Sequence, residues 1–131
     1  MAEPNDDSIL ETTKKLVGIE PDNTDFDTEI VTHINSVFFT LQQLGVGPKL
    51  GFMIMGSEET WSQFILLEQI MAVKSYMGLK VKLLFDPPVT GPATAAMESL
   101  ATQMEWRLKT YMEGVQWDEA SNSSSLNMEM T

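Results

Sequence analysis

The chain has 131 residues, and its 43% hydrophobic and 21% charged content is typical of one folded, soluble domain. Cysteine is absent, which excludes disulfides, thiolate metal ligands and cysteine nucleophiles. The net charge is −11, whereas tight sequence-independent binding to nucleic acid needs clustered basic residues. No apolar run reaches the roughly 18 residues that cross a bilayer, and the acidic start MAEPNDDS does not suggest a secretory signal.

The charge is unevenly distributed along the chain. Residues 1–29 hold nine acids against two lysines, and from Glu113 onward there are four acids and no base. Between Lys74 and Lys109, five bases face three acids. An acidic surface repels phosphate, so it suits a wall past which DNA slides without binding.

Two amphipathic helices are expected in the first third of the chain. Asp7 or Ser8 can cap a short helix that Gly18 ends. Thr24 or Asp25 then begins a second helix that Gly45 ends. The apolar residues of this second helix recur at spacings of three and four: Phe26, Ile30, Ile34, Val37, Phe38, Leu41 and Leu44.

The segment Val46–Glu59 is expected to be an irregular connector, because several glycines and Pro48 break any helix there. Phe52–Met55 form a small apolar island within it. This island is either a short strand or a loop that packs beneath the helices, and its length is too short for periodicity to decide.

A third helix is expected from about Thr60 to Phe85, with Leu66 as the place where it could be interrupted. Its apolar residues cover an arc of about 200°, which is wider than a helix on the outside of a monomer needs. The helix is therefore either central in its bundle or buried against another copy. Gly78 costs about 1 kcal/mol relative to alanine inside a helix, and the close approach of a neighbouring helix would explain it.

A fourth helix is expected to begin at Pro92 and to end near Gly114. The following tail is rich in Ser and Asn and cannot form a core of its own. The predicted fold is all-α: a small bundle of about four helices with an irregular connector between the second and third and an extended C-terminal tail. We assign residues 1–117 to a helical domain and residues 118–131 to a polar tail that partners order.

Three features of the sequence invite a chemical interpretation, and each has a better structural one. His33 and Glu29 lie one turn apart, but a metal site or a proton relay needs more partners than this pair. The acids of residues 22–29 lack the glycine and glutamate positions of an EF-hand loop, so helix capping explains them better. The glycines of residues 45–51 follow a helix rather than a strand, so they form turns rather than a nucleotide site. We predict no enzymatic activity, no metal and no cofactor.

Several long blocks, including HINSVFFTLQQLGVGP and VKSYMGLKVKLLFDPP, resemble the head–tail connector (adaptor) proteins of tailed phages. The resemblance spans roughly Ile9–Glu113, and its blocks are Thr24–Pro48, Val73–Pro88 and Glu105–Leu108. It implies a structural virion protein, made in the host cytoplasm and located in the neck, that forms a homo-oligomeric ring of about a dozen copies.

Such a ring would dock on the portal protein, extend the DNA channel and provide the platform for the next neck protein, a stopper or tail completion protein. Double-stranded DNA would pass through without specific binding, and no membrane would be involved. The alternative, from another functional class, is a phage-encoded helical DNA-binding or packaging regulator, which strong salt-dependent binding to DNA would support.

Candidate contact residues follow from their positions on the expected helix faces and from this resemblance. Lys80 lies near the centre of the apolar arc, so its side chain either extends along that surface to solvent or pairs with an acid of a neighbouring copy. Trp106 lies on a polar helix face, where it either anchors an interface or packs beneath the connector. The expected subunit interface comprises Tyr76, Lys80, Leu83 and Trp106. The expected contacts with the portal or another partner are Trp117, Leu126, Met128 and Met130 in the tail, with Phe52 and Ile54 in the connector.

Overall fold

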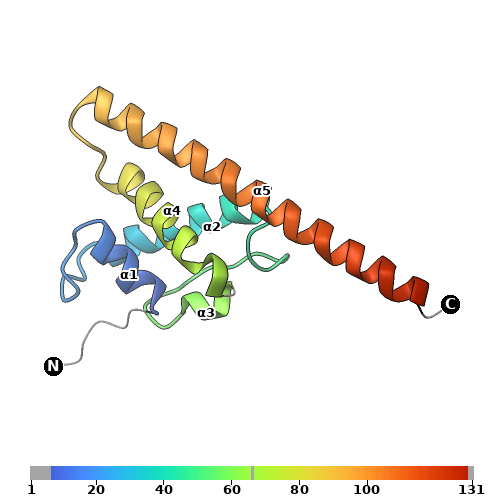
Figure 1. The fold of residues 1–131 in the computed structure, drawn as a ribbon. Helices are drawn as coiled ribbons and strands as arrows, with labels where there is room; N and C mark the ends of the chain where they lie inside the picture. Colours follow the sequence, from blue (N-terminus) through green and yellow to red (C-terminus); the bar gives the residue numbers. More distant parts are fainter. Residues whose placement is uncertain (1–6, 66, 130–131) are drawn as a thin grey trace.

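The computed structural model describes residues 7–65 and 67–129, the latter with backbone only at 67–68 and 115–129. The fold is a bundle of helices (Figure 1), and no strand occurs in these two ranges. The all-α prediction is therefore confirmed. The helices are α1 (Ile9–Leu16), α2 (Asp27–Gln43), α3 (Trp61–Phe64), α4 (Leu67–Phe85) and α5 (Gly91–Glu129).

Helix α1 begins and ends where the sequence predicts. The Ser8 hydroxyl accepts a hydrogen bond from the Glu11 amide at 3.3 Å, and Gly18 follows the helix with φ +87°, a conformation that favours glycine. The last turn of α1 is tied to the first turn of α2, because the Lys14 ammonium lies 2.8 Å from an Asp27 carboxylate oxygen.

Helix α2 begins later than expected. Its N-cap is Phe26, which makes no side-chain capping bond, so the expected cap at Thr24 or Asp25 is wrong. The turn before α2 is stabilised by Asn23 instead, whose side-chain oxygen accepts a hydrogen bond from the Asp25 amide at 3.1 Å. The expected apolar face of α2 is confirmed at five positions, since Ile30, Ile34, Val37, Phe38 and Leu41 are buried. Leu44 is only partly buried, and Phe26 is 41% exposed, so the prediction is wrong at Phe26.

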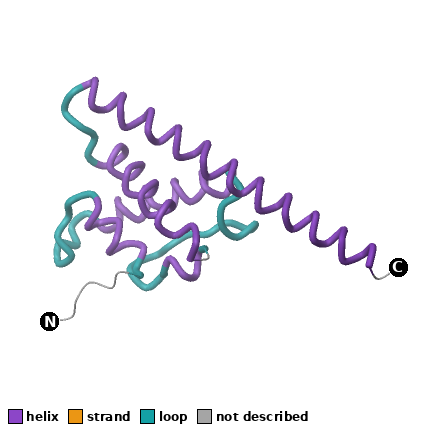
Figure 2. Tube along the Cα trace, in the orientation of Figure 1, coloured by secondary structure: helices purple, strands orange, loops and turns teal. Residues whose placement is uncertain are grey.

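The connector between α2 and α3 is a loop rather than a strand (Figure 2), so the second of the two interpretations is correct. It is held beneath α2 by the Asn35 side chain, which donates to the Ile54 carbonyl at 2.9 Å and accepts from the Ile54 amide at 2.8 Å. Beside this pair, the Phe52 ring packs against Phe38 and Phe64 at centroid distances of 5.2 and 5.3 Å.

The expected interruption between α3 and α4 is confirmed. A capping box begins α3, in which Thr60 and Gln63 exchange side-chain and backbone hydrogen bonds. Ile65 then adopts an extended conformation, with φ −150° and ψ 157°, and α4 begins at Leu67. Two backbone hydrogen bonds join this corner to the start of α1, from Ile9 to the Glu59 carbonyl and from Trp61 to the Asp7 carbonyl.

Helix α4 is the central element, because it packs against each of the other four helices. This position accounts for its wide apolar arc within one chain. Gly78 lies where a Cβ atom would come within 2.9 Å of the Leu16 side chain, so the expected close approach of another helix is confirmed and that helix is α1.

Helix α5 begins next to Thr90, whose hydroxyl accepts a hydrogen bond from the Ala93 amide at 3.3 Å. It then continues through Gly114 to Glu129 and extends beyond the bundle (Figure 1). The expected end near Gly114 is therefore wrong. A glycine in a helix interior costs only about 1 kcal/mol, which weakens a helix without terminating it.

Candidate interaction surfaces

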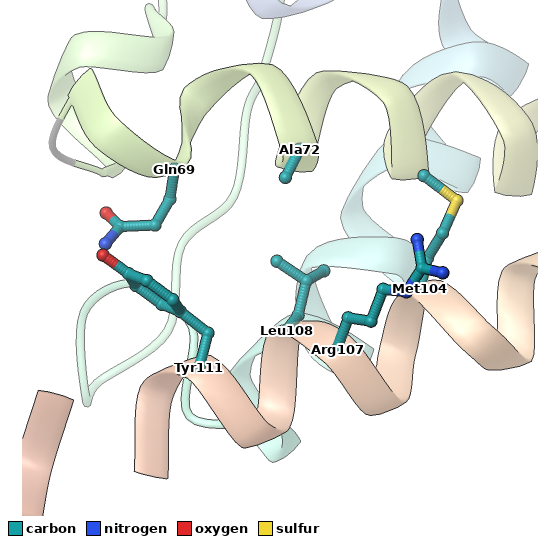
Figure 3. Close-up of a pocket in the computed structure, with 6 residues that line it drawn as sticks. All are labelled: Gln69, Ala72, Met104, Arg107, Leu108 and Tyr111. Carbon is teal, nitrogen blue, oxygen red and sulfur yellow. The ribbon is translucent and has the colours of Figure 1, made fainter. Parts of the chain in front are cut away.

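The first candidate surface lies along the junction of α4 and α5. Figure 3 shows Gln69 and Ala72 of α4 facing Met104, Leu108 and Tyr111 of α5 across a cavity of about 280 Å³ that Arg107 also lines. A second cavity, of about 400 Å³, lies further along the same two helices and reaches Leu16 of α1.

Met104 lines both cavities, so the two depressions adjoin along α4 and α5, and we name them together the α4–α5 groove. The walls of this groove are mainly apolar, with Arg107 in one half and Lys82 in the other. Lys82 is already paired with Asp86 at 2.8 Å. The groove therefore combines apolar walls with positive charge, which suits a ligand segment that is apolar and acidic.

A polar cluster of α4 and α5 residues lies next to this junction. The Tyr76 hydroxyl donates a hydrogen bond to a Glu105 carboxylate oxygen at 2.9 Å, and the Lys80 ammonium lies 3.9 Å from the same oxygen. Burial, together with the hydrogen bond and the charge of Glu105, raises the pKa of Tyr76 well above its usual value. This cluster links α4 to α5 through one carboxylate.

The second candidate surface is formed by the connector and α2. Leu50, Met53 and Met55 are largely exposed on the connector, and Phe39 is exposed on α2 beside them. We name these four residues the connector surface. A cavity of about 320 Å³ lies among Phe39, Leu50, Met53 and their neighbours.

The exposed connector is held in place by Glu59. Its carboxylate accepts hydrogen bonds from the Met55 amide at 2.8 Å and the Gly56 amide at 3.4 Å. Desolvation raises the pKa of this carboxyl group, but the backbone N–H groups of Met55, Glu59 and Gly56 lower it, and the net pKa lies below the usual value. The loop thus presents its methionines in a defined position.

The sequence model of the family described as "Phage connector protein" matches residues 9–115 of this chain. The chain belongs to this family. No curated protein and no solved structure matches it significantly. The resemblance noted in the sequence is thereby confirmed, and the family supports a general role as a head–tail connector, with a place in the neck of a phage particle and contacts with portal and neck proteins.

Several contact residues predicted for this phage connector protein lie at accessible positions. Trp106 is 67% exposed on α5, and Leu83 and Phe52 are partly buried. Lys80 is also partly buried, and the acid beside it is Glu105 of the same chain. The expected pairing of Lys80 with a neighbouring copy therefore has an internal competitor.

Two other predicted contact residues are buried in the core of this chain. Ile54 is 1% exposed and Tyr76 is fully buried, so neither side chain is available to a partner in this conformation. The reason is tertiary: Asn35 draws Ile54 under α2, and α5 covers Tyr76. The backbone of Trp117, Leu126 and Met128 lies in α5, while their side chains and the whole of Met130 lie outside the described residues.

The sequence interpretation named Phe52 and Ile54 as contacts in the segment Val46–Glu59 and did not single out Leu50, Met53 and Met55. Their exposure could have been predicted from the glycines around them, because a glycine-rich loop cannot bury all of its apolar side chains.

His33 lies 3.7 Å from Glu29, as an i,i+4 neighbour. Within the described ranges no group of three potential metal ligands is found, and no helix there is long and apolar enough to span a bilayer.

Proposed function

We propose that this connector protein forms a ring of about a dozen copies that docks on the portal, extends the DNA channel and supports the next neck protein. The family match over residues 9–115 is the observation that carries the proposal. The connector family is one of structural proteins, so a mechanical role is favoured over a catalytic one.

The distribution of apolar residues supports assembly into an oligomer. Many large hydrophobic side chains remain exposed in the single chain, on α5, on the connector and on the α4–α5 turn. Patches of this kind commonly mark surfaces that other proteins cover. Trp106 and Leu83 are our proposed subunit contacts on the α4–α5 layer, together with Lys80, whose ammonium lies 3.9 Å from Glu105.

The charge of the protein supports a channel through which DNA passes without specific binding. The turn between α1 and α2 exposes Glu20, Asp22 and Asp25, and the whole chain carries a net charge of −11. Such a surface repels the phosphate backbone over about a Debye length, roughly 8 Å in physiological salt. We assign this acidic turn to the wall of the channel.

The direct test mixes the purified full chain with purified portal particles of the same phage and examines the mixture by electron microscopy. The proposal predicts a ring of added density beneath the portal, and it predicts no salt-dependent retention of double-stranded DNA by the free protein. Portal particles that stay bare in the presence of excess protein would contradict it.

The C-terminal segment is our proposed contact with the portal, through Trp117, Leu126, Met128 and Met130. Removing residues 118–131 should abolish docking and leave the circular dichroism spectrum and thermal midpoint of the bundle nearly unchanged. The control is a chain in which the same residues are replaced by a Gly/Ser segment of equal length. Docking by the truncated chain would contradict this assignment.

A further inference from the structure

We propose that the connector surface of one copy inserts into the α4–α5 groove of the next copy around the ring. This inference rests on the proposed ring and specifies which surfaces close it. The two surfaces share no residue, so one copy can use both at once.

The groove has the shape and chemistry of a receptor for long apolar side chains. Its two cavities, about 280 and 400 Å³, each exceed the space of one methionine side chain and are open to solvent. Leu100 and Tyr111 on its α5 wall are 46% and 44% exposed, so the groove is only half closed by this chain. A second apolar element laid along it would complete the burial of both residues.

The connector surface has the form of the complementary ligand. Leu50 and Met55 are 99% and 87% exposed, although the backbone between them is fixed by the hydrogen bonds of Asn35 to Ile54. Because this part of the loop is already ordered, little further entropy is lost when it binds. Methionine side chains adapt to irregular cavities, which suits a groove with two separate depressions.

Charge favours the same pairing. Arg107 lines the groove, and Glu58 is exposed three residues after Met55. Neither Arg107 nor Glu58 forms an ion pair with any other described residue of its own chain. No base lies between Lys49 and Lys74, so the end of the connector that would enter the groove is purely acidic. A cation and an anion that have no ion-pair partner among the described side chains of their own chain therefore meet in this arrangement.

Symmetry gives the reason for a ring rather than a dimer. A contact between two different surfaces is heterologous, so the copy added last always has one surface still free for the next copy. Such contacts form a closed ring only when the rotation from each copy to the next brings the last copy back to the first. A self-complementary patch would instead stop at two copies.

The absence of cysteine allows this contact to be tested by chemical crosslinking in the full chain. Met53→Cys in the connector surface is combined with Ala72→Cys in the groove, and rings assembled on portals are treated with a short bis-maleimide. The matched control replaces Ala72→Cys by Val89→Cys, because Val89 is fully exposed in the turn before α5 and lines neither cavity.

The inference predicts a ladder of covalent oligomers extending to the full ring for the groove pair, and dimers at most for each single-cysteine chain. Rings that are visible in the microscope but give no ladder, or give an equal ladder with the Val89→Cys control, would overturn the inference and leave the ring itself standing. Bare portals would overturn the proposed function and this inference together, so the two failures are distinguishable.

A charge exchange tests the same contact without crosslinking. Arg107→Glu should reduce the fraction of portals that carry a complete ring by about tenfold or more, because it places like charges together at the contact. Glu58→Arg in the same chain should restore most of the loss. An Arg107→Glu chain that assembles normally, or a double variant that remains as defective as the single one, would contradict the proposed pairing.

Discussion

The α1–α4 bundle and helix α5 differ in how much of their apolar side chains they bury. The bundle has a closed core, in which Trp61, Phe38 and Ile34 are each at most 1% exposed. Helix α5 is the longest element, with 39 residues, yet among its residues with described side chains only Ala101 and Leu108 are buried. One region therefore buries its apolar side chains within the chain, whereas the other leaves most of its described apolar side chains at least partly exposed.

The physical chemistry of isolated helices reinforces this difference. A helix gains most of its stability from packing an apolar face, because intrinsic propensity alone leaves helices shorter than about 15 residues marginal in water. Helix α5 packs chiefly on α4, and its C-terminal part extends beyond the bundle (Figure 2). We therefore expect the two regions to respond differently to substitution.

Two tryptophans provide the widest contrast. Trp61→Ala should reduce the free energy of unfolding by about 3–5 kcal/mol, because it leaves a cavity beside Phe38 in a fully buried site. Trp106→Ala on the exposed face of α5 should change it by less than about 0.5 kcal/mol. Urea unfolding followed by circular dichroism measures both. Equal effects of the two substitutions would remove the distinction between the regions.

The link between α1 and α2 should also be sensitive. Asp27→Ala should destabilise the bundle by about 2 kcal/mol, because among the described residues the buried Lys14 ammonium would keep only the Pro21 carbonyl, at 3.3 Å. Replacing both Lys14 and Asp27 by methionine and alanine should recover part of this loss, since no buried charge then lacks its partner. A double variant that is less stable than Asp27→Ala alone would contradict this explanation.

Two helical glycines, Gly78 in α4 and Gly114 in α5, should respond in opposite ways to a larger side chain. Gly78→Leu should destabilise the protein by about 1–3 kcal/mol, because α1 approaches α4 closely at that point. Leu16→Ala in the same chain should relieve part of that loss. Gly114→Ala meets no atom within 4 Å and should raise helicity, with a gain of up to about 1 kcal/mol. Thermal unfolding of the three chains provides the measurement, and a stabilising Gly78→Leu would show that the contact is loose.

Replacing Tyr76 should have the smallest effect on stability at neutral pH. Its effect on the pH dependence of stability should appear above about pH 10. The folded state raises the pKa of Tyr76, whereas in the unfolded chain the phenol ionises near its ordinary value of about 10. The contribution of Tyr76 to stability is therefore complete below about pH 10 and declines as the pH rises above it. Urea midpoints measured from pH 8 to 11 should fall less steeply for Tyr76→Phe than for the natural chain. Identical slopes would exclude Tyr76 as a source of the decline.

Much of the fold could be predicted because local signals determine it. The Ser8 cap, the stops at Gly18 and Gly45, and the apolar face of α2 depend on neighbours within one or two turns. Close approach at Gly78 could be predicted as well, since a glycine inside an apolar helix rarely has another reason. These features need no knowledge of the tertiary structure.

The candidate surfaces were less predictable, because they depend on distant contacts. Nothing near Ile54 indicates that Asn35, nineteen residues earlier, will bind its backbone and draw its side chain into the core. Likewise, Glu105 lies beside Lys80, for which the sequence allowed either extension to solvent or a pair with a neighbouring copy. Sequence patterns predict which elements could form an interface, whereas tertiary packing determines which of their side chains remain exposed.

Hydrogen exchange of the free protein and of the protein assembled on portals tests the central claim most directly. The account predicts that backbone amides of residues 91–114 in α5 exchange faster than those of α2 in the free chain, and that assembly slows them by about tenfold or more while α2 is unchanged. Equal protection of α5 and α2 in the free chain, with no change on portals, would contradict it.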